Sequence, residues 1–428
     1  MTTTLASPMA ALVARAERLF PGGVNSPVRA FRAVGRPPVV LERGEAAYVW
    51  DADGRRLLDL IGAWGPAILG HADPRVVGAV TRAAANGFAL GATHPLEIEL
   101  GELIVRRMPS VERLRFTASG TEAVMSALRV ARAATGRDLV VKFGGAYHGH
   151  VDCLLAEAGS GIATQGIPGS AGVASAVAAQ TIVLRWNDPA AVSAAFEAHP
   201  GRIAALIAEP VIANSGVIAP RPGFLDHLRE TASAHGALLV LDEVITGFRL
   251  GPGGAQGRFG IRPDLTILGK VIGGGMPIGA YGGRADLMDL VAPAGPVYQA
   301  GTLAGHPLSM AAGIATLRAL GPEAYERLEA AGERLAAGLL AAANRAGREI
   351  AVGHVGSLVT PFFRPTRPAD AAEAMAVDRA AASRFFGAML DRGVLLPPSP
   401  FEACFVSLAH GSAELDMVLD AAGEAFRQ

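Results

Sequence analysis

The stretch from Leu238 to Gly283 restricts the possible folds more than any other part of the sequence. One apolar run, Leu238 to Leu241, ends in Asp242, and a second, Thr266 to Gly269, ends in Lys270. Short apolar runs of this length are typical of buried strands. In open α/β sheets, functional groups lie at the carboxyl ends of the strands. We therefore expect Asp242 and Lys270 to face one cleft from the ends of two strands.

The scarcity of lysine supports a special role for Lys270. Of the 38 Lys and Arg residues, only Lys142 and Lys270 are lysines. Arginine serves solubility, ion pairs and phosphate contacts, whereas a buried lysine amine can also form a Schiff base with a carbonyl. In pyridoxal phosphate enzymes a lysine holds the cofactor aldehyde, and an Asp commonly pairs with the pyridinium nitrogen. The alternative is that both lysines are chance survivors on the surface.

Strand and helix patterns alternate from about residue 60 to residue 310. This alternation predicts an α/β fold with a largely parallel sheet. Thr121, Tyr147 and Glu209 each follow a predicted strand closely, and Asn214 comes shortly after Glu209. The convergence of these residues on one edge is stronger evidence for a site than any single motif.

The segment Ser119-Gly120-Thr121 lies between a predicted strand, 113–117, and a strong helix, 123–134. Free amides and the helix dipole at such a junction favour phosphate, and the hydroxyls can donate to it. The alternative is a plain N-cap with Glu122 in the first turn.

For four other residues we weigh a functional role against a purely structural one. His148 and His150 have no acidic or Cys partner in zinc spacing, so we expect no metal. Trp64 could stack on a ring or substrate, although such a Trp more often packs in a core or an interface. Arg29 is either a bidentate clamp for a substrate carboxylate or a surface residue after a turn.

Composition excludes several classes of protein. The 428 residues are 50% hydrophobic and 18% charged with a net charge of −1, which argues against nucleic acid or an anionic membrane as partner. We expect neither a signal peptide nor a transmembrane helix. Two distant cysteines indicate a reducing, cytoplasmic compartment. The positive mean hydropathy of +0.33 indicates a large interior or a large apolar subunit interface, and we expect a homodimer.

Motifs along nearly the whole chain carry a specific resemblance. They are PGGVNSPVRAF (21–31), WGPAILGH (64–71), SGTEA (119–123), YHGH (147–150), LDEVITGFR (241–249), LGKVIGGGMPIGAYGG (268–283), VYQAGTL (297–303) and FEACFVSLAH (401–410). With these motifs the chain resembles the class III pyridoxal-phosphate-dependent aminotransferases, and specifically their glutamate-1-semialdehyde aminomutase branch. The first and last motifs point to that branch.

The resemblance implies a fold type I transferase, with a large domain on a mostly parallel seven-stranded sheet and a smaller α+β domain from both termini. The expected boundaries are 1–60 and 313–428 for the small domain and 61–312 for the large one. It also implies the cofactor pyridoxal 5'-phosphate, with its pyridoxamine form, and a role for each matching residue. The catalytic residues would be Lys270, Asp242 and Tyr147. The cofactor-binding residues would be Ser119, Gly120, Thr121, Tyr147, His148, Glu209, Asn214, Asp242, Lys270 and Thr302, of which Thr302 would reach the other subunit's cofactor. The substrate-binding residues would be Ser26, Arg29, Trp64 and Glu402.

The implied reaction moves an amino group within glutamate-1-semialdehyde to give 5-aminolevulinate, a tetrapyrrole precursor, by way of bound 4,5-diaminovalerate. Residues 159–173, rich in Gly, Ser, Pro and Ala, match the family's gating loop. The chain departs from the branch at Ala89–Thr93, Ala118, Ala146 and His306. These departures leave open an aminotransferase of the same scaffold that acts on another amino acid with an external keto acid. A binding protein without catalysis is disfavoured by Lys270 and Asp242.

Overall fold

The structure is a computed structural model that describes residues 7–157 and 167–428. The chain divides into two compact units. The smaller unit comprises Met1–Asp73, Arg327–Pro368 and Ala374–Gln428, and the larger comprises Pro74–Glu326 and Ala369–Glu373. The domain boundaries expected near residues 60 and 312 stay a prediction.

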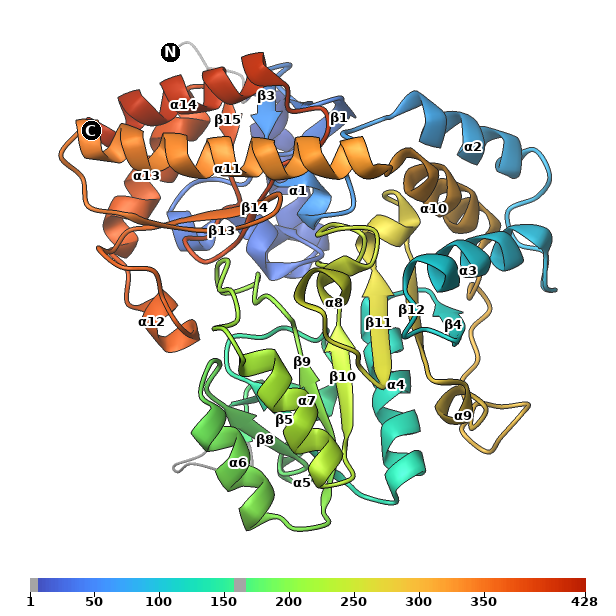
Figure 1. Cartoon of the computed structure of the whole chain (residues 1–428). Helices are drawn as coiled ribbons and strands as arrows, with labels where there is room; N and C mark the ends of the chain where they lie inside the picture. The colour runs from blue at the N-terminus through green and yellow to red at the C-terminus, as the bar shows by residue number, and fades with distance from the viewer. Residues whose placement is uncertain (1–6, 158–166) are drawn as a thin grey trace. The chain divides into compact units, whose positions relative to one another are not determined.

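A seven-stranded sheet forms the centre of the larger unit (Figure 1). In spatial order its strands are β4 (Arg113–Thr117), β12 (Gly279–Gly283), β11 (Leu265–Gly269), β10 (Leu238–Asp242), β9 (Ile203–Ala208), β5 (Leu139–Phe143) and β8 (Thr181–Leu184). β12 runs antiparallel to both its neighbours, and the remaining pairs are parallel. The sheet confirms the predicted α/β class with a mostly parallel seven-stranded sheet.

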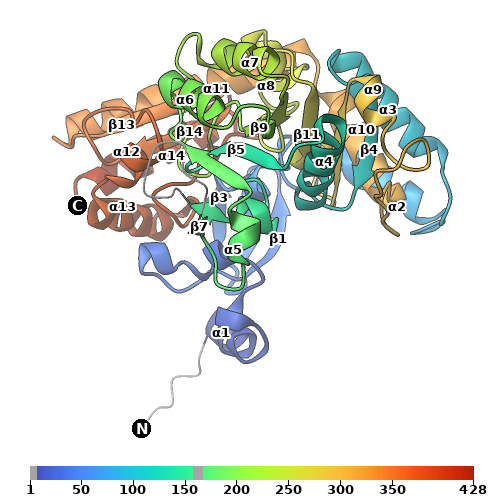
Figure 2. The same cartoon turned by 90° about the horizontal axis from the view of Figure 1, so that it is seen from below.

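Alternate residues of the central strands pack beneath one long helix, α4 (Gly120–Thr135). The α4 side chains Ala123, Ala127 and Val130 belong to one buried cluster with the strand residues Val240 and Ile267. Since successive strand side chains point to opposite faces, the intervening residues face away from α4. The helix α7 (Phe224–Ala234) packs against β9 and β10, and α6 (Pro189–Ala198) lies beside α7 (Figure 2).

Glycine allows β12 to lie between β4 and β11. A Cβ atom added to Gly279 would come 2.1 Å from the carbonyl oxygen of Ser119, and one added to Gly283 would come 2.1 Å from that of Asp264. Three glycines give this strand little intrinsic β propensity, so only the close approach of its neighbours explains its position.

Further elements complete the larger unit. They are α2 (Pro74–Ala84), α3 (Pro95–Arg107), β6 (Ala156–Glu157), β7 (Ile167–Pro168), α5 (Ser175–Ala178), α8 (Gly254–Phe259), α9 (Ala285–Met288) and α10 (Pro307–Ala319). The helices α11 (Pro322–Arg345) and α12 (Ala371–Met375) begin in this unit and continue into the smaller one. The described part of the chain contains no helix long and apolar enough to cross a membrane.

The smaller unit joins both ends of the chain in one sheet. Its order is β1 (Leu41–Glu45), β2 (Tyr48–Asp51), β3 (Arg56–Asp59) and β15 (Val394–Leu395), and β15 pairs with β3 in parallel. A three-stranded sheet of β13 (Ala351–Val355), β14 (Leu358–Phe362) and β16 (Cys404–Phe405) completes it, together with α1 (Pro8–Leu19), α13 (Arg379–Asp391) and α14 (Ser412–Phe426). This arrangement confirms the small α+β domain built from both termini.

One predicted helix is interrupted in the structure. The sequence pattern predicts a single helix over residues 371–392, but the structure has α12 and α13 separated by residues 376–378. The side chain of Asp378 accepts a hydrogen bond from the amide of Ala381 at 2.9 Å. A side-chain cap of this kind starts a new helix, because it satisfies an amide that lacks a partner in the first turn.

Candidate functional site

Three strand ends bring the central candidates to one edge of the sheet. Asp242 is the last residue of β10, Glu209 directly follows β9 and Lys270 directly follows β11. These three strands are adjacent and parallel, with Asp242 in register with Ile267. The two runs singled out in the sequence therefore end side by side, at the edge where open α/β sheets bind ligands.

The carboxylate of Asp242 is held by the loop that follows β5. Its Oδ2 lies 2.8 Å from Nδ1 of His148, and its Oδ1 accepts a hydrogen bond from the amide of Val244 at 3.0 Å. His148 is buried, and its Nε2 has no hydrogen-bond partner among the described residues. Burial lowers the pKa of His148, although the hydrogen bond to Asp242 opposes this. The arrangement fits a neutral imidazole that donates its Nδ1 proton to Asp242.

Glu209 is a second buried acid beside Asp242. Its Oε1 accepts a hydrogen bond from the amide of Tyr147 at 2.7 Å, and Nδ2 of Asn214 lies 3.3 Å from Oε2. Burial, with the negative charge of Asp242, raises the pKa of Glu209 to about 8. Near neutral pH the site therefore holds one acid that favours the protonated form, next to an aspartate with two hydrogen-bond donors.

Two further candidates lie at this edge, Lys270 with a strained backbone and Tyr147 with an exposed aromatic ring. Lys270 has a φ of +47°, a left-handed conformation that costs free energy for a residue with a Cβ. The side chain of Tyr147 is 53% exposed, and burial of its remainder, with the charge of Asp242, raises its pKa. Backbone strain at a reactive residue is common in active sites.

The helix α4 begins at the Ser119-Gly120-Thr121 motif, where the structure confirms the N-cap, while phosphate binding stays a prediction. The Ser119 hydroxyl accepts a hydrogen bond from the amide of Glu122 at 3.3 Å. The Glu122 carboxylate accepts in turn from the amides of Ala118 at 2.7 Å and Ser119 at 3.0 Å. This reciprocal capping box fixes the entry of the chain into the helix.

Capping still leaves donors for an anion. Gly120 and Thr121 occupy the first turn of α4, where amides lack a partner within the helix. The neighbouring loop comes very close, because a Cβ added to Gly149 would lie 2.3 Å from Oγ1 of Thr121. The amide of His150 also contacts that hydroxyl at 3.4 Å. The loop that carries Tyr147 and His148 therefore packs onto the candidate anion site.

Thr302 is exposed, and two arginines form hydrogen bonds with the segment that precedes it. Arg129 donates to the carbonyl of Tyr298 at 3.0 Å, and Arg115 donates to Gln299 Oε1 at 3.2 Å. Within the larger unit we find no described contact that directs Thr302 toward Lys270 or Asp242. Residues 159–166 of the expected gating loop lie outside the described residues.

The four candidate substrate-binding residues belong to the smaller unit. Ser26 precedes a short 3-10 turn, Pro27–Ala30, that carries the exposed Arg29. Trp64 has a φ of +67° and follows Ala63 at +53°, so two consecutive residues with side chains adopt the left-handed conformation. Such strain supports a functional hypothesis for Trp64. The backbone carbonyl of Glu402 accepts a hydrogen bond from Thr360 at 3.3 Å.

The surface interpretation of Lys142 is wrong. Lys142 lies on β5 with 7% of its surface exposed, and its Nζ donates to the carbonyl of Leu154 at 2.9 Å. Sequence reasoning gave this residue no role, although the count of two lysines was the available signal. For the histidines the structure assigns His148 to Asp242, and the described residues form no cluster of three His, Cys, Asp or Glu side chains suited to a metal.

Comparison with known proteins identifies the class. The profile of the class III aminotransferases matches residues 31–405. The chain belongs to this family.

Its curated relatives include two proteins named glutamate-1-semialdehyde 2,1-aminomutase. The protein from Roseiflexus castenholzii is 55% identical over 417 residues, 97% of this chain and 96% of the relative. The protein from Thermomicrobium roseum is 56% identical over 414 residues, 96% of each.

Solved structures agree on the fold. An omega-transaminase from Sphaerobacter thermophilus superposes with a TM-score of 0.93 at 35% identity, covering 99% of this chain and 98% of that one. A glutamate-1-semialdehyde aminomutase from Pseudomonas aeruginosa PAO1 in complex with PMP gives 0.87 at 28% identity, covering 97% and 93%.

Proposed function

We propose that this protein converts glutamate-1-semialdehyde to 5-aminolevulinate by intramolecular amino transfer that depends on pyridoxal phosphate. The supporting observation is that Asp242 and Lys270 end adjacent parallel strands, at the sheet edge where His148 orients Asp242. The names of the relatives that are more than half identical over nearly the whole chain supply the substrate.

The residues at this edge fit the cofactor. The first turn of α4 offers amides to a phosphate, and Asp242 offers a carboxylate to a ring nitrogen. When bound, pyridoxal phosphate and its pyridoxamine form supply an electron sink and carry the amino group. The residues that would hold it are Ser119, Gly120 and Thr121 at the phosphate, Asp242 at the ring nitrogen, Asn214 and Glu209 near the phenolic oxygen, and Tyr147 and His148 around the ring.

The protein contributes positioning and proton transfer. Lys270 would supply the amine that holds the cofactor aldehyde, and its Nζ would carry the proton that moves between the substrate and the cofactor. Asp242 would stabilise a proton on the ring nitrogen through its negative charge, because Coulomb attraction is strong in a buried site. Tyr147 covers the ring and excludes water from it.

Ser26, Arg29, Trp64 and Glu402 are the proposed substrate-binding residues. Arg29 presents a planar guanidinium fork that suits the single carboxylate of glutamate-1-semialdehyde, and the Ser26 hydroxyl adds a donor. Glu402 brings a negative charge where an arginine would favour a second carboxylate. The proposed substrate has an aldehyde in place of that second carboxylate, so an acid is compatible with it.

We further propose a homodimer in which Thr302 reaches the partner subunit's cofactor. Large apolar side chains are exposed on the larger unit at Phe88, Leu90, Ile98, Tyr298 and Leu303. The segments that carry them lie side by side, because Nε2 of His94 is 2.7 Å from the carbonyl oxygen of Gly305. Exposed apolar groups gathered in this way favour a protein interface. Sedimentation of the parent and of Ile98→Asp tests this, and a monomeric parent would contradict it.

The decisive assay supplies glutamate-1-semialdehyde alone and follows 5-aminolevulinate. An aminomutase returns its amino group within each cycle, so turnover continues with no added amino donor or keto acid. An aminotransferase on the same scaffold would stop after about one turnover and resume when a keto acid is added. The two free, buried cysteines, Cys153 and Cys404, fit the proposed cytoplasmic location.

A further inference from the structure

Four consecutive residues adopt the left-handed conformation in a turn of the smaller unit, shortly after β3. Gly62, Ala63, Trp64 and Gly65 have φ angles of +53°, +53°, +67° and +120°. Glycine adopts this conformation readily, but Ala63 and Trp64 carry a Cβ and are strained by it. Such a turn persists only where its surroundings determine it. Because Trp64 is a proposed substrate-binding residue, the contacts that hold this turn also set the position of its side chain.

The carboxylate of Asp59, the last residue of β3, holds the start of this turn. Its Oδ1 accepts a hydrogen bond from the amide of Ile61 at 2.8 Å, and its Oδ2 accepts one from the amide of Gly62 at 3.1 Å. Nε2 of His71 lies 2.7 Å from the same Oδ2 and must carry a proton to donate to it. Asp59 is only 3% exposed. Three donors therefore converge on one buried carboxylate, which satisfies it away from water.

A segment from the other end of the chain packs against the same turn. The amide of Phe405 donates to the carbonyl of Leu60 at 2.8 Å, and Nε2 of His410 lies 3.1 Å from the carbonyl oxygen of Asp59. A Cβ atom added to Gly62 would come 3.3 Å from the Cβ of Phe405. These contacts leave the turn little space on that side, so the strained conformation is held both by the carboxylate and by this segment.

Asp51 provides a comparison within the same sheet. It is 1% exposed, and its Oδ1 accepts hydrogen bonds from the amides of Asp53 at 3.1 Å and Arg55 at 2.8 Å. Nε of Arg55 lies 3.3 Å from its Oδ2. Asp51 therefore also holds a turn through two amides and one side-chain donor. The turn that it holds, between β2 and β3, carries none of the proposed site residues.

We propose that Asp59 is a positioning residue for substrate binding, whose carboxylate, with His71 as a donor, fixes the strained turn and thereby the Trp64 side chain. The residues proposed to hold the cofactor belong to the larger unit. Loss of the Asp59 carboxylate should therefore weaken substrate binding while the cofactor stays bound. This inference rests on the proposed function through the role of Trp64.

The direct test is fluorine NMR of the holoenzyme made with fluorinated tryptophan. The chain has three tryptophans, Trp50, Trp64 and Trp186, and substitution of each by phenylalanine assigns its resonance. Asp59→Asn should shift or broaden the Trp64 resonance and leave that of Trp186 unchanged, because an amide side chain cannot accept from all three donors. Asp51→Asn should leave the Trp64 resonance at its position in the parent. An unchanged Trp64 resonance in Asp59→Asn would overturn the proposal, as would an equal change in Asp51→Asn.

Steady-state kinetics of the holoenzyme connect the turn to the substrate. In Asp59→Asn, KM for glutamate-1-semialdehyde should rise about tenfold and kcat should stay within about twofold, because binding shared by the ground and transition states is lost. The visible band of the bound cofactor should match that of the parent. Asp51→Asn should keep the parent's KM, even where it lowers the urea midpoint as much as Asp59→Asn does. A moved Trp64 resonance with the parent's KM would overturn the connection to the substrate.

Two variants of His71 keep the proposal testable if Asp59→Asn does not fold. Glutamine places its amide nitrogen close to the position of Nε2 and can donate to Asp59, whereas leucine cannot donate. His71→Leu should move the Trp64 resonance and raise KM about threefold, as expected for one lost donor. His71→Gln should differ from the parent less than His71→Leu does in both measurements. Equal changes in the two variants would overturn the role of the His71 donor.

Failure of the proposed function gives a different result. A parent that binds the cofactor but makes no 5-aminolevulinate overturns the proposed substrate. The fluorine resonances of the parent, Asp59→Asn and Asp51→Asn still decide whether Asp59 positions Trp64, because they do not depend on the identity of the substrate.

Discussion

Acidic side chains have different partners at the two edges of the seven-stranded sheet. At the carboxyl edge Asp242 and Glu209 are buried, and their direct partners are a histidine, an amide side chain and backbone amides. At the amino edge Asp264, which directly precedes β11, receives two arginines. Nη1 of Arg229 lies 2.7 Å and Nη1 of Arg284 lies 3.1 Å from its carboxylate oxygens.

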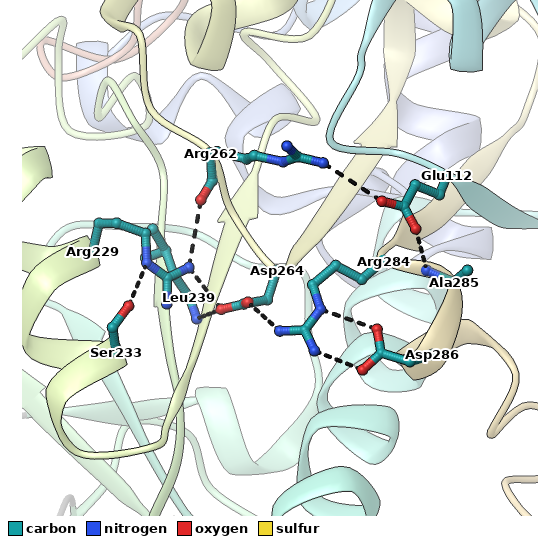
Figure 3. A network of polar contacts seen from close by, with 9 residues as sticks. All are labelled: Glu112, Arg229, Ser233, Leu239, Arg262, Asp264, Arg284, Ala285 and Asp286. Carbon is teal, nitrogen blue, oxygen red and sulfur yellow. Dashed lines mark hydrogen bonds and ion pairs between the residues drawn. The ribbon is translucent and has the colours of Figure 1, made fainter.

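Figure 3 shows how far the pairing at the amino edge extends. Asp264 also accepts the amide of Leu239 at 2.8 Å, so it links β10 to the start of β11. Arg284 continues to Asp286, and Arg262 reaches Glu112 at 3.5 Å. Each cation drawn there has an acidic or carbonyl oxygen near it.

This difference in charge pairing indicates that the amino edge serves stability and the carboxyl edge is suited to reactivity. At the amino edge, two partly exposed arginines offset the cost of burying Asp264, and Asp264 also links β10 to the start of β11. Buried acids without a directly bound cation bind protons more strongly, as the pKa of Glu209 of about 8 illustrates. We therefore expect the reactive groups at the carboxyl edge, and substitutions at the two edges should have different effects.

Removal of the Lys270 amine should have the largest effect on activity. Lys270→Ala should lower kcat for 5-aminolevulinate formation by about 10²–10⁴-fold or more, because a proton-transfer group and the cofactor anchor are both lost. The visible band of the bound cofactor should change with it. Lys270→Arg is the matched control, since it keeps the charge and should be equally inactive. A Lys270→Ala protein with the parent's rate would contradict the assignment.

Loss of charge at Asp242 should be nearly as damaging. In Asp242→Asn the side-chain oxygen can still accept the proton of His148, so folding should be retained. The ring nitrogen would lose its counter-charge, and a buried pair broken in this way costs about 3–5 kcal/mol. We expect kcat to fall on the order of 10²–10³-fold while urea unfolding stays close to the parent. Unchanged kcat would exclude the pairing.

The buried acid Glu209 should make stability depend on pH. Its pKa in the folded protein, about 8, lies above the ordinary value of 4.5. The contribution of Glu209 to the free energy of unfolding is therefore fully present below pH 4.5 and is lost as the pH rises through 8. Glu209→Gln should remove that loss, on the order of a few kcal/mol, when unfolding is compared at pH 5 and pH 9. Parallel pH profiles for the parent and this variant would contradict the raised pKa.

The amino edge should respond in stability alone. Asp264→Asn removes the carboxylate that pairs with Arg229 and one of the two that pair with Arg284, and it should cost about 2–3 kcal/mol in urea unfolding. Arg284→Gln should cost less than about 1 kcal/mol, because its side chain is 45% exposed and the pair is screened. In both variants kcat per folded molecule should match the parent. A large loss of kcat at this edge would break the proposed division between the edges.

Local sequence patterns predicted much of the candidate site. The bounds of β4, Arg113–Thr117, agree with the strand predicted from the sequence. The helix start after Ser119 was recognisable from its cap and first turn. Such features depend on residues that are neighbours along the chain. Periodicity and capping therefore reveal them.

Other features had no local signal. The strand β12 reads as a glycine-rich turn, and only the backbones on either side explain why it is a strand. Lysine is typical of the surface, yet Lys142 is buried and its Nζ donates to the carbonyl of Leu154 in the turn Asp152–Leu154. The break between α12 and α13 depends on one capping contact of Asp378.

The sequence by itself determined which residues stand at the ends of strands and helices, because hydrophobic period and end residues are properties of short segments. Only the tertiary structure decided which of those ends meet. β5 lies two strands from β10 although about a hundred residues separate them, and this order lets His148 reach Asp242. Strand order follows from burying both faces of the sheet at once, a condition on the whole chain that no single segment carries.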